Sequence, residues 1–288
     1  MEKPEKIWQT SQRQFDYSEK TLVMAILNTT PDSFSDGGKF SGLEEALKQT
    51  EKLVTEGADI LDIGGESTRP NSKRVSVEEE IRRTSPIIEA IKSRFDVAIS
   101  IDTSKAKVAE SAVNAGAEII NDVSGLRFDE RIAEVAARHQ TGLVLMHLRG
   151  TFETMHEKRE SENIVREVAE GFRFSIEKAH RFGVKNKQIA LDIGIGFSKT
   201  FAQNLELIAK LDKLTAEFSG FPMLVGTSRK SFLGKILGDV PTDERLRGSL
   251  ASAGIAVWNG AKIVRVHDVK ATVEMIKTVE AIRKYRSF

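Results

Sequence analysis

The sequence predicts an α/β protein folded as a single (β/α)8 TIM barrel, and three features of the chain indicate this. Eight short apolar runs each end on a polar residue, helix-like segments separate most of them, and the length is 288 residues. A buried parallel strand is a short run of Val, Ile and Leu, and one barrel of this kind takes roughly 250 residues. One barrel therefore accounts for almost the whole chain.

The eight apolar runs are expected to be the barrel strands. They cover residues 22–27, 59–63, 97–101, 118–120, 142–146, 189–191, 222–225 and 262–264. In this fold the active site lies at the carboxyl ends of the strands, where all eight loops meet. The polar residues that follow the runs are therefore candidates for one site, although strands also end in Gly, Asn and Asp for purely structural reasons.

Helices are expected between the strands. The first four cover residues 43–56, 77–95, 105–115 and 130–138. Gly57 and Gly116 follow two of them, at positions where a left-handed residue would end a helix. Between the fifth and sixth strands, apolar residues recur every four positions from Ile164 to Ala179, which is typical of a helix with one buried face.

Residues 1–21 are expected to form an N-terminal extension to a barrel domain at 22–288. Residues 7–15 mix apolar and polar side chains ahead of a turn, which favours a short hairpin that closes the bottom of the barrel. The connections 28–42 and 67–76 are longer than the usual ~2–6 residues of such loops. Both are expected to be mobile lids over the site.

The composition excludes several kinds of partner. Lys and Arg number 43 against 42 Asp and Glu, a formal net charge of +1, so no overall field favours nucleic acid or an anionic membrane. The chain has no cysteine, which rules out a disulfide framework and thiolate metal ligands. Without a signal-like stretch or an apolar run of about 20 residues, the protein is expected to be soluble and cytoplasmic.

Three polar residues at strand ends form the first candidate site. Asp102, Asn121 and Asp192 follow the third, fourth and sixth runs and are expected to face one cavity. Two carboxylates and an amide make a poor zinc site, but they suit a planar heterocycle that presents several N–H donors. The alternative is a structural network in which Asp102 caps the helix that starts near Ser104.

Cations follow the seventh and eighth strands. The stretch from Gly226 to Phe232 places Ser hydroxyls and two cations at a helix start, which suits a carboxylate or phosphate, although simple capping competes. Arg265 and His267 alternate, so both are expected on the inward face as a cationic corner for a polyanion, with Val266 opposite. His147 fits a structural role as well as a functional one, and His156 is expected to lie on the surface.

Together these segments resemble the dihydropteroate synthases of the folate pathway, over nearly the whole chain. The similar stretches are ILNTTPDSFSDGG from Ile26, DIGGESTRP from Asp62, ISIDT from Ile99, IINDVSG from Ile119, LMHLRGT from Leu145, LDIGIGF from Leu191, VGTSRKSFLG from Val225 and IVRVHD from Ile263. The resemblance implies condensation of 6-hydroxymethyl-7,8-dihydropterin pyrophosphate with para-aminobenzoate, with release of pyrophosphate. It also implies Mg²⁺ as cofactor and a homodimer, for which the helices after strands six to eight are the expected surface.

The resemblance further implies roles for individual residues. The pterin would be bound by Asp102, Asn121, Met146, Asp192, Phe197, Gly226, Lys230 and Arg265. The pyrophosphate would be bound by Asn28, Thr68, Arg69, Arg265 and His267, with Asn28 as the metal ligand. Para-aminobenzoate would contact Phe34, Thr68, Arg69, Pro70, Lys230 and Ser231. The implied catalytic residues are Asp36, Asp102, Lys230, Arg265 and His267.

Two other functions stay open on the sequence alone. The pterin-binding barrel of methyltetrahydrofolate methyltransferases shares the pterin carboxylates but transfers a methyl group to a corrinoid; residues 67–70 and 228–231 favour the synthase. The second alternative is a catalytically silent barrel that only binds pterin or serves as a partner-binding subunit. Retention of Asn28, Lys230 and Arg265 argues against a silent barrel. Nucleic acid and membranes are not expected partners.

Overall fold

The computed structural model describes residues 6–18, 20–29, 39–68 and 72–287, and their central feature is a closed barrel of eight parallel strands. Around the barrel the order is β10, β3, β4, β5, β6, β7, β8 and β9. The strands are β3 (Leu22–Asn28), β4 (Ile60–Gly64), β5 (Ala98–Asp102), β6 (Ile119–Asp122), β7 (Gly142–Met146), β8 (Ile189–Asp192), β9 (Met223–Val225) and β10 (Ile263–Val266). The predicted (β/α)8 TIM barrel is confirmed, and every strand begins and ends within two residues of its predicted bounds.

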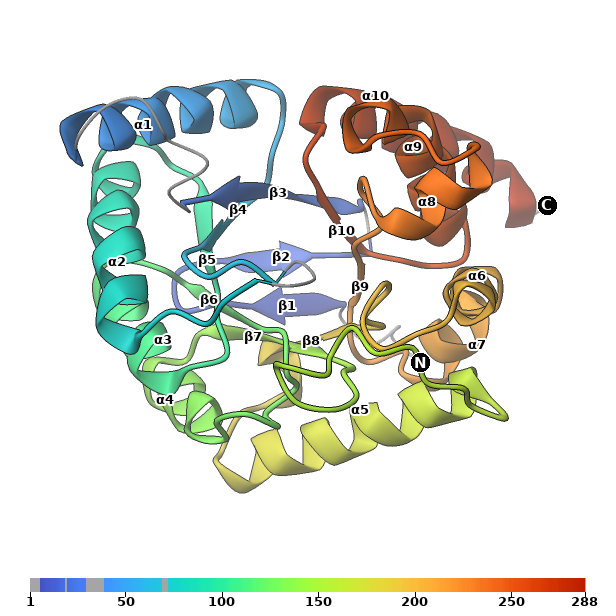
Figure 1. Cartoon of the computed structure of the whole chain (residues 1–288), viewed down its shortest axis with the longest axis horizontal. Coiled ribbons are helices and arrows are strands. Elements are labelled where there is room, and N and C mark those ends of the chain that lie inside the picture. Colours follow the sequence, from blue (N-terminus) through green and yellow to red (C-terminus); the bar gives the residue numbers. More distant parts are fainter. Residues whose placement is uncertain (1–5, 19, 30–38, 69–71, 288) are drawn as a thin grey trace.

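Helices cover the outside of the barrel and follow one another around it in chain order (Figure 1). In the described part of the chain the α-helices are α1 (Lys39–Thr55), α2 (Val77–Arg94), α3 (Ala106–Asn114), α4 (Arg131–His139), α5 (Ile164–Arg181), α6 (Phe201–Ala209), α7 (Leu211–Glu217), α8 (Ser231–Ile236), α9 (Leu246–Trp258) and α10 (Val269–Arg283). Short 3-10 turns lie at η2 (Asn186–Gln188), η3 (Thr242–Arg245) and η4 (Lys284–Ser287). Gly57 and Gly116 have φ angles of 101° and 118°, as predicted for residues that end helices.

Side chains alternate along each strand between the barrel interior and the helix layer. In β4, Leu61 and Ile63 pack outward against the helices, whereas Ile60 belongs to an apolar cluster inside the barrel. Because the side-chain period of a strand is two, Asp62 shares the inward face with Ile60 and lies one layer nearer the carboxyl end. The interior is therefore apolar in the layer of Ile60, and a charged side chain lies in the next layer toward the carboxyl end.

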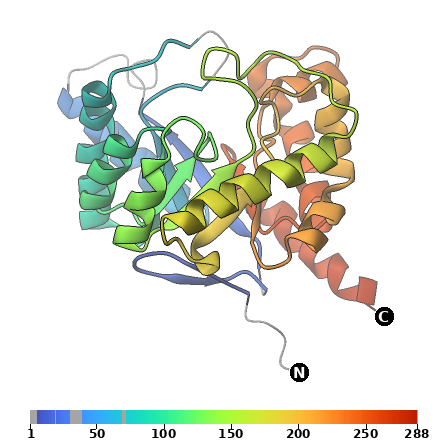
Figure 2. The ribbon, with the colours of Figure 1, turned by 90° about the horizontal axis from the view of Figure 1, so that it is seen from below.

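The N-terminal strands β1 (Ile7–Gln9) and β2 (Gln14–Asp16) form an antiparallel hairpin. Trp8 of β1 is fully buried in the lower interior cluster, and its Nε1 donates to the carbonyl oxygen of Gln188 at 2.8 Å. Figure 2 shows the hairpin lying across one end of the barrel, opposite the long loops. The predicted hairpin at the bottom of the barrel is confirmed, and it leaves the carboxyl end for a site.

The two connections predicted to be mobile lids lie partly outside the described residues, at 30–38 and 69–71. α1 begins at Lys39 rather than at residue 43, so the first connection is shorter than expected. Among the described residues no helix is long and apolar enough to cross a membrane.

Candidate active site

A hydrogen-bonded group of charged side chains lies at the carboxyl end of the barrel, with Arg265 of β10 at its centre. Its Nε donates to Oδ2 of Asp62 in β4, and its Nη2 donates to Oδ2 of Asp102 at the end of β5, each at 2.6 Å. Nδ2 of Asn121 in β6 donates to the same Asp62 oxygen at 3.0 Å. We call Asp62, Asp102, Asn121 and Arg265 the carboxylate cluster; four strands supply its members.

Burial dominates the electrostatics of the carboxylate cluster. It raises the pKa of Asp102 to about 7, with the charge of Arg265 acting against the rise and the charge of Asp62 adding to it. For Arg265, burial disfavours the charged form, but Asp62 and Asp102 outweigh it and raise the pKa of the guanidinium above its ordinary value. Arg265 therefore stays charged, whereas Asp102 can change protonation near neutral pH.

The structural alternative for Asp102, capping of the following helix, is wrong. α3 begins after Lys105, whose side chain makes no capping hydrogen bond. The N–H of Ala106 instead donates to Oδ2 of Asp129 at 3.0 Å. Asp102 points into the barrel and is only 9% exposed.

Asp192 and Lys230 form a second charged group at the same end of the barrel. Asp192 ends β8, and its Oδ1 accepts the N–H of Gly194 at 2.8 Å. Burial raises the pKa of Asp192, and the charge of Lys230 opposes that rise. Burial lowers the pKa of Lys230 to about 8, with the carboxylate of Asp192 opposing the fall. The structure thus brings together two residues that lie far apart in the sequence.

Aromatic and apolar side chains adjoin Lys230. Its Nζ lies 4.6 Å from the centroid of the Phe197 ring and donates to the carbonyl oxygen of Ile195. Gly196 has a φ angle of 84°, and a Cβ there would lie 3.0 Å from Cδ of Lys230, so the lysine stem needs glycine at this position. Phe197 also packs in an apolar cluster with Met146, Val123, Leu148, Phe152, Met155 and Phe128.

Of the two cations that follow β9, Arg229 and Lys230, only Lys230 lies at the barrel mouth. Arg229 turns to Asp268, with 2.6 Å between its Nη2 and Oδ1 of Asp268, whereas Lys230 interacts with Asp192. Ser231 begins α8 and is exposed, and Lys230 at its N-cap makes no side-chain capping bond. Capping therefore does not explain Lys230, and the hydroxyl of Ser231 is accessible.

Gly226 and His267 lie close to Arg265. Nδ1 of His267 lies 3.0 Å from Oγ of Ser228. A Cβ on Gly226 would lie 3.6 Å from the Cβ of Arg265, so the segments after β9 and along β10 run close together. Val266 is buried against the helix layer, in agreement with its predicted place opposite Arg265.

Asn28 borders the carboxylate cluster. It pairs with Gly64 in the register of β3 and β4. A Cβ on Gly64 would lie 3.9 Å from Oδ1 of Asn28 and 3.8 Å from Oδ2 of Asp102. Thr68 follows β4 and is half-buried. The other site residues predicted in these two connections lie outside the described residues; they are Phe34, Asp36, Arg69 and Pro70.

Two histidines after β7 have different environments. His147 is 4% exposed, and its imidazole lies against α5, where a Cβ on Gly171 would come within 2.5 Å of its Cδ2. Burial lowers the pKa of His147 well below its usual value, so it is a neutral structural residue. The prediction of a surface location for His156 is wrong: it is half-buried, and its Nε2 lies 2.7 Å from the carbonyl oxygen of Thr68.

Sequence reasoning missed two buried charges at this site. Asp62 is fully buried, and the signal was a carboxylate in the middle of an otherwise apolar run. Lys199 is 4% exposed and donates to the carbonyl oxygens of His147, Gly194 and Phe197 at 3.3, 2.8 and 3.1 Å. Burial lowers the pKa of Lys199 to about 7. No local pattern marks this lysine, because one of its partners belongs to the segment after another strand.

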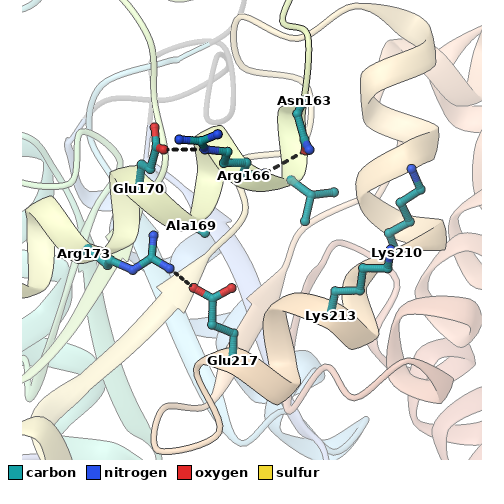
Figure 3. Close-up of a pocket in the computed structure, with 9 residues that line it drawn as sticks. Asn163, Arg166, Ala169, Glu170, Arg173, Lys210, Lys213 and Glu217 are labelled. Carbon is teal, nitrogen blue, oxygen red and sulfur yellow. Dashed lines mark hydrogen bonds and ion pairs between the residues drawn. The ribbon is translucent and has the colours of Figure 1, made fainter.

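A separate cavity of about 420 Å³ lies on the outer surface, between α5 and the α6–α7 pair (Figure 3). Arg166 pairs with Glu170 at 2.8 Å, and Arg173 pairs with Glu217. The cavity contains none of the predicted site residues, and these two cations already have partners. Within the described part of the chain, no group of three or more His, Cys, Asp or Glu side chains could hold a metal ion.

The fold and the site define a class of protein, a (β/α)8 barrel with buried carboxylate and amide groups gathered at its carboxyl end. A sequence model of the pterin binding enzyme family matches residues 24–267, most of the chain. Within that class, dihydropteroate synthases that are 46–47% identical over 92–93% of this chain show that it belongs to the dihydropteroate synthase family.

Dihydropteroate synthases of known sequence or structure are similar to this chain over nearly their full lengths. The dihydropteroate synthase of Synechocystis is 47% identical over 93% of this chain and 92% of its own length. The structure of the Yersinia pestis enzyme with a sulfonamide drug has a TM-score of 0.89 and 41% identity, and covers 96% of this chain and 99% of its own. That of the Xanthomonas albilineans enzyme with 4-aminobenzoic acid has a TM-score of 0.89 and 38% identity, with coverage of 97% and 98%.

Proposed function

We propose that this chain is a dihydropteroate synthase, which joins 6-hydroxymethyl-7,8-dihydropterin pyrophosphate to para-aminobenzoate and releases pyrophosphate. The observation that carries the proposal is the placement of Lys230, bonded to the Ile195 carbonyl and lying over Phe197, at the barrel mouth that also holds the buried Asp102 and Asp192. The sulfonamide and 4-aminobenzoic acid bound to the two similar enzymes support the choice of the second substrate.

The pterin ring is held through its N–H edge. Asp102, Asn121 and Asp192 offer oxygen acceptors to the amino group and ring N–H groups, and their burial makes each unmatched bond costly. Lys230 donates to the ring carbonyl and a ring nitrogen. The aromatic and apolar residues beside it, Met146, Phe197 and Gly226, line the faces of the ring. Arg265 stacks on the ring and stays anchored to two carboxylates.

The pyrophosphate binds to the cations of the β10 side. The guanidinium of Arg265 carries five N–H donors, and its bonds to Asp62 and Asp102 use two of them. The remaining donors serve the pyrophosphate oxygens, together with Asn28, Thr68, Arg69 and His267. Anchoring by two buried carboxylates keeps the guanidinium in place, so little reorganisation is needed when the leaving group departs.

Asn28 would hold Mg²⁺ together with oxygens of the pyrophosphate. Its amide oxygen borders the carboxylate cluster and is a ligand of the type that Mg²⁺ accepts. Mg²⁺ in phosphate-transfer sites takes few protein ligands and several from substrate phosphates, so one amide oxygen fits this role. When bound, the ion supplies positive charge that stabilises the leaving pyrophosphate.

Para-aminobenzoate lies between Lys230 and Thr68. The exposed hydroxyl of Ser231 at the start of α8 donates to its carboxylate. Thr68 accepts a hydrogen bond from His156 through its carbonyl oxygen, and the His156 ring stacks on Phe197, which adjoins Lys230. The other residues that we assign to this substrate are Phe34, Arg69 and Pro70.

The reaction depends on the placement of charge more than on a strong base. The bond between the pterin methylene carbon and a pyrophosphate oxygen breaks, its electrons go to the oxygen, and a cation delocalised into the dihydropterin remains. Asp102 and Asp192 stabilise that cation, while Lys230, Arg265 and His267 stabilise the anion. The amine nitrogen then bonds to the methylene carbon and gives up a proton, for which the released pyrophosphate is the acceptor. Asp36 belongs to the loop that excludes water during this step.

The proposed function is tested by incubating the full chain with the pterin pyrophosphate, para-aminobenzoate and Mg²⁺ and separating the products. Dihydropteroate and pyrophosphate are expected in equal amounts, and a chelator is expected to lower the rate. Pterin binding without product would favour the silent barrel. Methyl transfer from methyltetrahydrofolate to a corrinoid would favour the methyltransferase.

Pterin binding is expected to have a bell-shaped pH dependence. Burial raises the pKa of Asp102 to about 7 and lowers that of Lys230 to about 8. The form with ionised Asp102 and charged Lys230 is therefore most populated between these values, and affinity falls on either side. Calorimetry measures the pterin affinity at several pH values. A pterin that lacks phosphate is used, so that protonation of the leaving group does not contribute. In Asp102→Asn the loss of pterin affinity on the acid side should disappear. In Lys230→Arg the loss on the alkaline side should move to higher pH. A wild-type affinity that does not change with pH would contradict both assignments.

We also propose that the protein is a homodimer that associates through α9 and α10. Ile255 and Ile282 are 51% and 57% exposed on these helices. They border a groove of about 440 Å³ without charged side chains, lined by Leu250, Ala251, Gly254, Ile255, Trp258, Met275, Val279 and Ile282. Exposed apolar grooves of this kind mark contact surfaces, and a two-fold dimer buries the same patch on both copies.

Charge placed in this groove is expected to convert the dimer to a monomer. Ile255→Glu and Ile282→Glu should each do so, because an unpaired carboxylate would be buried at the interface. Light scattering after size-exclusion chromatography measures the mass. Phe174→Glu, which alters a 44% exposed aromatic residue on α5, is the control and should stay dimeric. A monomeric wild-type protein would contradict the proposal.

A further inference from the structure

One histidine side chain connects three of the segments that follow barrel strands. Nε2 of His156 lies 2.7 Å from the carbonyl oxygen of Thr68. The imidazole stacks on the ring of Phe197, with 5.6 Å between centroids and an angle of 29° between the planes. Thr68 follows β4, His156 follows β7 and Phe197 follows β8. Since a carbonyl oxygen only accepts hydrogen bonds, Nε2 carries the proton and donates to Thr68.

The imidazole is neutral in its resting state. Burial lowers the pKa of His156, and the charge of Lys230 lowers it further, while the backbone of Thr68 and of Gly196 acts in the opposite direction. A neutral ring with its proton on Nε2 still donates to Thr68. The hydrogen bond from His156, after β7, to Thr68, after β4, is therefore present at neutral pH while the imidazole is uncharged.

The backbone around His156 is held in place independently of its side chain. Both the N–H and the hydroxyl of Ser198 donate to the carbonyl oxygen of Met155, at 2.7 and 2.8 Å. Met155 is itself 1% exposed and packs in the apolar cluster that contains Phe197. The imidazole is thus presented from a fixed position, and its replacement leaves this anchoring intact.

We infer that His156 is a positioning residue for the aromatic amine substrate. It sets the distance between Thr68, on one side of the amine site, and Phe197, which contacts Lys230 on the other. The inference rests on the function proposed above, in which para-aminobenzoate lies between these two sides. Phe197 also lines the pterin ring, but the oxygen acceptors for the pterin are Asp102, Asn121 and Asp192, so loss of the His156 contact should change pterin affinity little.

Three replacements separate the two contacts of His156. His156→Ala removes both, His156→Phe keeps an aromatic ring beside Phe197 without a donor, and His156→Gln keeps an N–H donor. We expect His156→Ala and His156→Phe to raise KM for para-aminobenzoate by about three- to tenfold, the usual effect of one lost hydrogen bond. The rate at saturating amine and the Kd of a phosphate-free pterin should stay within about twofold of wild type. His156→Gln should recover most of the affinity for the amine.

The control is His139→Ala, a change at a histidine that bonds to Glu110 on the outer helices. An unchanged KM for the amine in His156→Ala overturns the inference, and so does a parallel loss of pterin affinity. If His156→Gln did not recover affinity for the amine, the hydrogen bond to Thr68 would not be the contact through which His156 acts, and the inference would be overturned in that part.

Amide hydrogen exchange in peptides covering 65–76 provides a readout that needs no turnover. Faster exchange in His156→Ala than in wild type is expected, because the bond to Thr68 is lost; unchanged exchange overturns the inference. Absence of dihydropteroate formation by the wild-type protein would instead contradict the proposed function, and the exchange measurement would still decide whether His156 holds this segment.

Discussion

Replacing Asp192 with alanine is expected to abolish turnover, with kcat/KM reduced on the order of a thousandfold, and Lys230→Ala should have an effect of similar size. Removal of one preorganised electrostatic group from an enzyme site costs about a hundredfold to a thousandfold in rate. Asp192 also loses its acceptor role toward the ring, and its removal leaves the buried Lys230 without the carboxylate that opposes the fall in its pKa. Steady-state assays with both substrates measure the effect.

The two replacements are expected to be non-additive. Because Asp192 and Lys230 shift each other's pKa, each single variant already removes the interaction between them. The double variant should therefore lose less activity than the product of the two single losses. Lys213→Ala, on the outer surface between α5 and α7, is the matched control and should keep wild-type rates. Wild-type rates in Asp192→Ala or Lys230→Ala would remove the assignment of that residue.

Arg265→Met is expected to produce the largest loss of stability among single changes at the site. The guanidinium bonds to two buried carboxylates, so its removal leaves Asp62 and Asp102 as uncompensated negative charges. Breaking a buried ion pair in this way costs about 3–5 kcal/mol in the free energy of unfolding. Denaturant unfolding at several pH values measures the effect, and Arg265→Lys, which keeps one charge but not the two-sided bonding, should lie between.

The cost of Arg265→Met is expected to shrink as the pH falls. The pKa of Asp102 is raised to about 7 in the folded protein, above its unfolded value, so its contribution to stability is present at acid pH and is lost as the pH rises through 7. Without Arg265 this pKa rises further, and protonation at low pH relieves the uncompensated charge. Arg229→Met, which breaks a partly exposed pair with Asp268, should cost no more than about 1 kcal/mol and serves as control. Equal losses in the two variants would contradict the role of Arg265.

The barrel could be predicted in detail because its signals are local. The eight apolar runs, the turn residues after them and Gly57 and Gly116 at helix ends each act over a few residues. Helix starts were less certain, as α1 shows, since its first turn carries no acidic residue to mark the start. His156 was misplaced for a related reason: a histidine in a loop gives no local sign of the segment it will contact.

The candidate site could be predicted as a set of residues but not as a set of contacts. Asp102, Asn121 and Asp192 were identified because they end strands, and the carboxyl ends of parallel strands meet. Asp62 was missed because it lies within a strand and not at its end, and only the closed barrel shows that the face it shares with Ile60 is the interior. Lys199 was missed because its partners include carbonyl oxygens of distant segments.

The sequence by itself determined where the strands and helices of this protein lie and which polar side chains stand at the strand ends, because periodicity and turn chemistry act between near neighbours. Only the tertiary structure decided the partners and the charges. Closure of the barrel places β10 beside β3 and brings Arg265 to Asp62 and Asp102, and it brings His156 to Thr68. Hydrogen bonds and pKa values depend on distance and burial in three dimensions, and neither quantity is written in the order of residues along the chain.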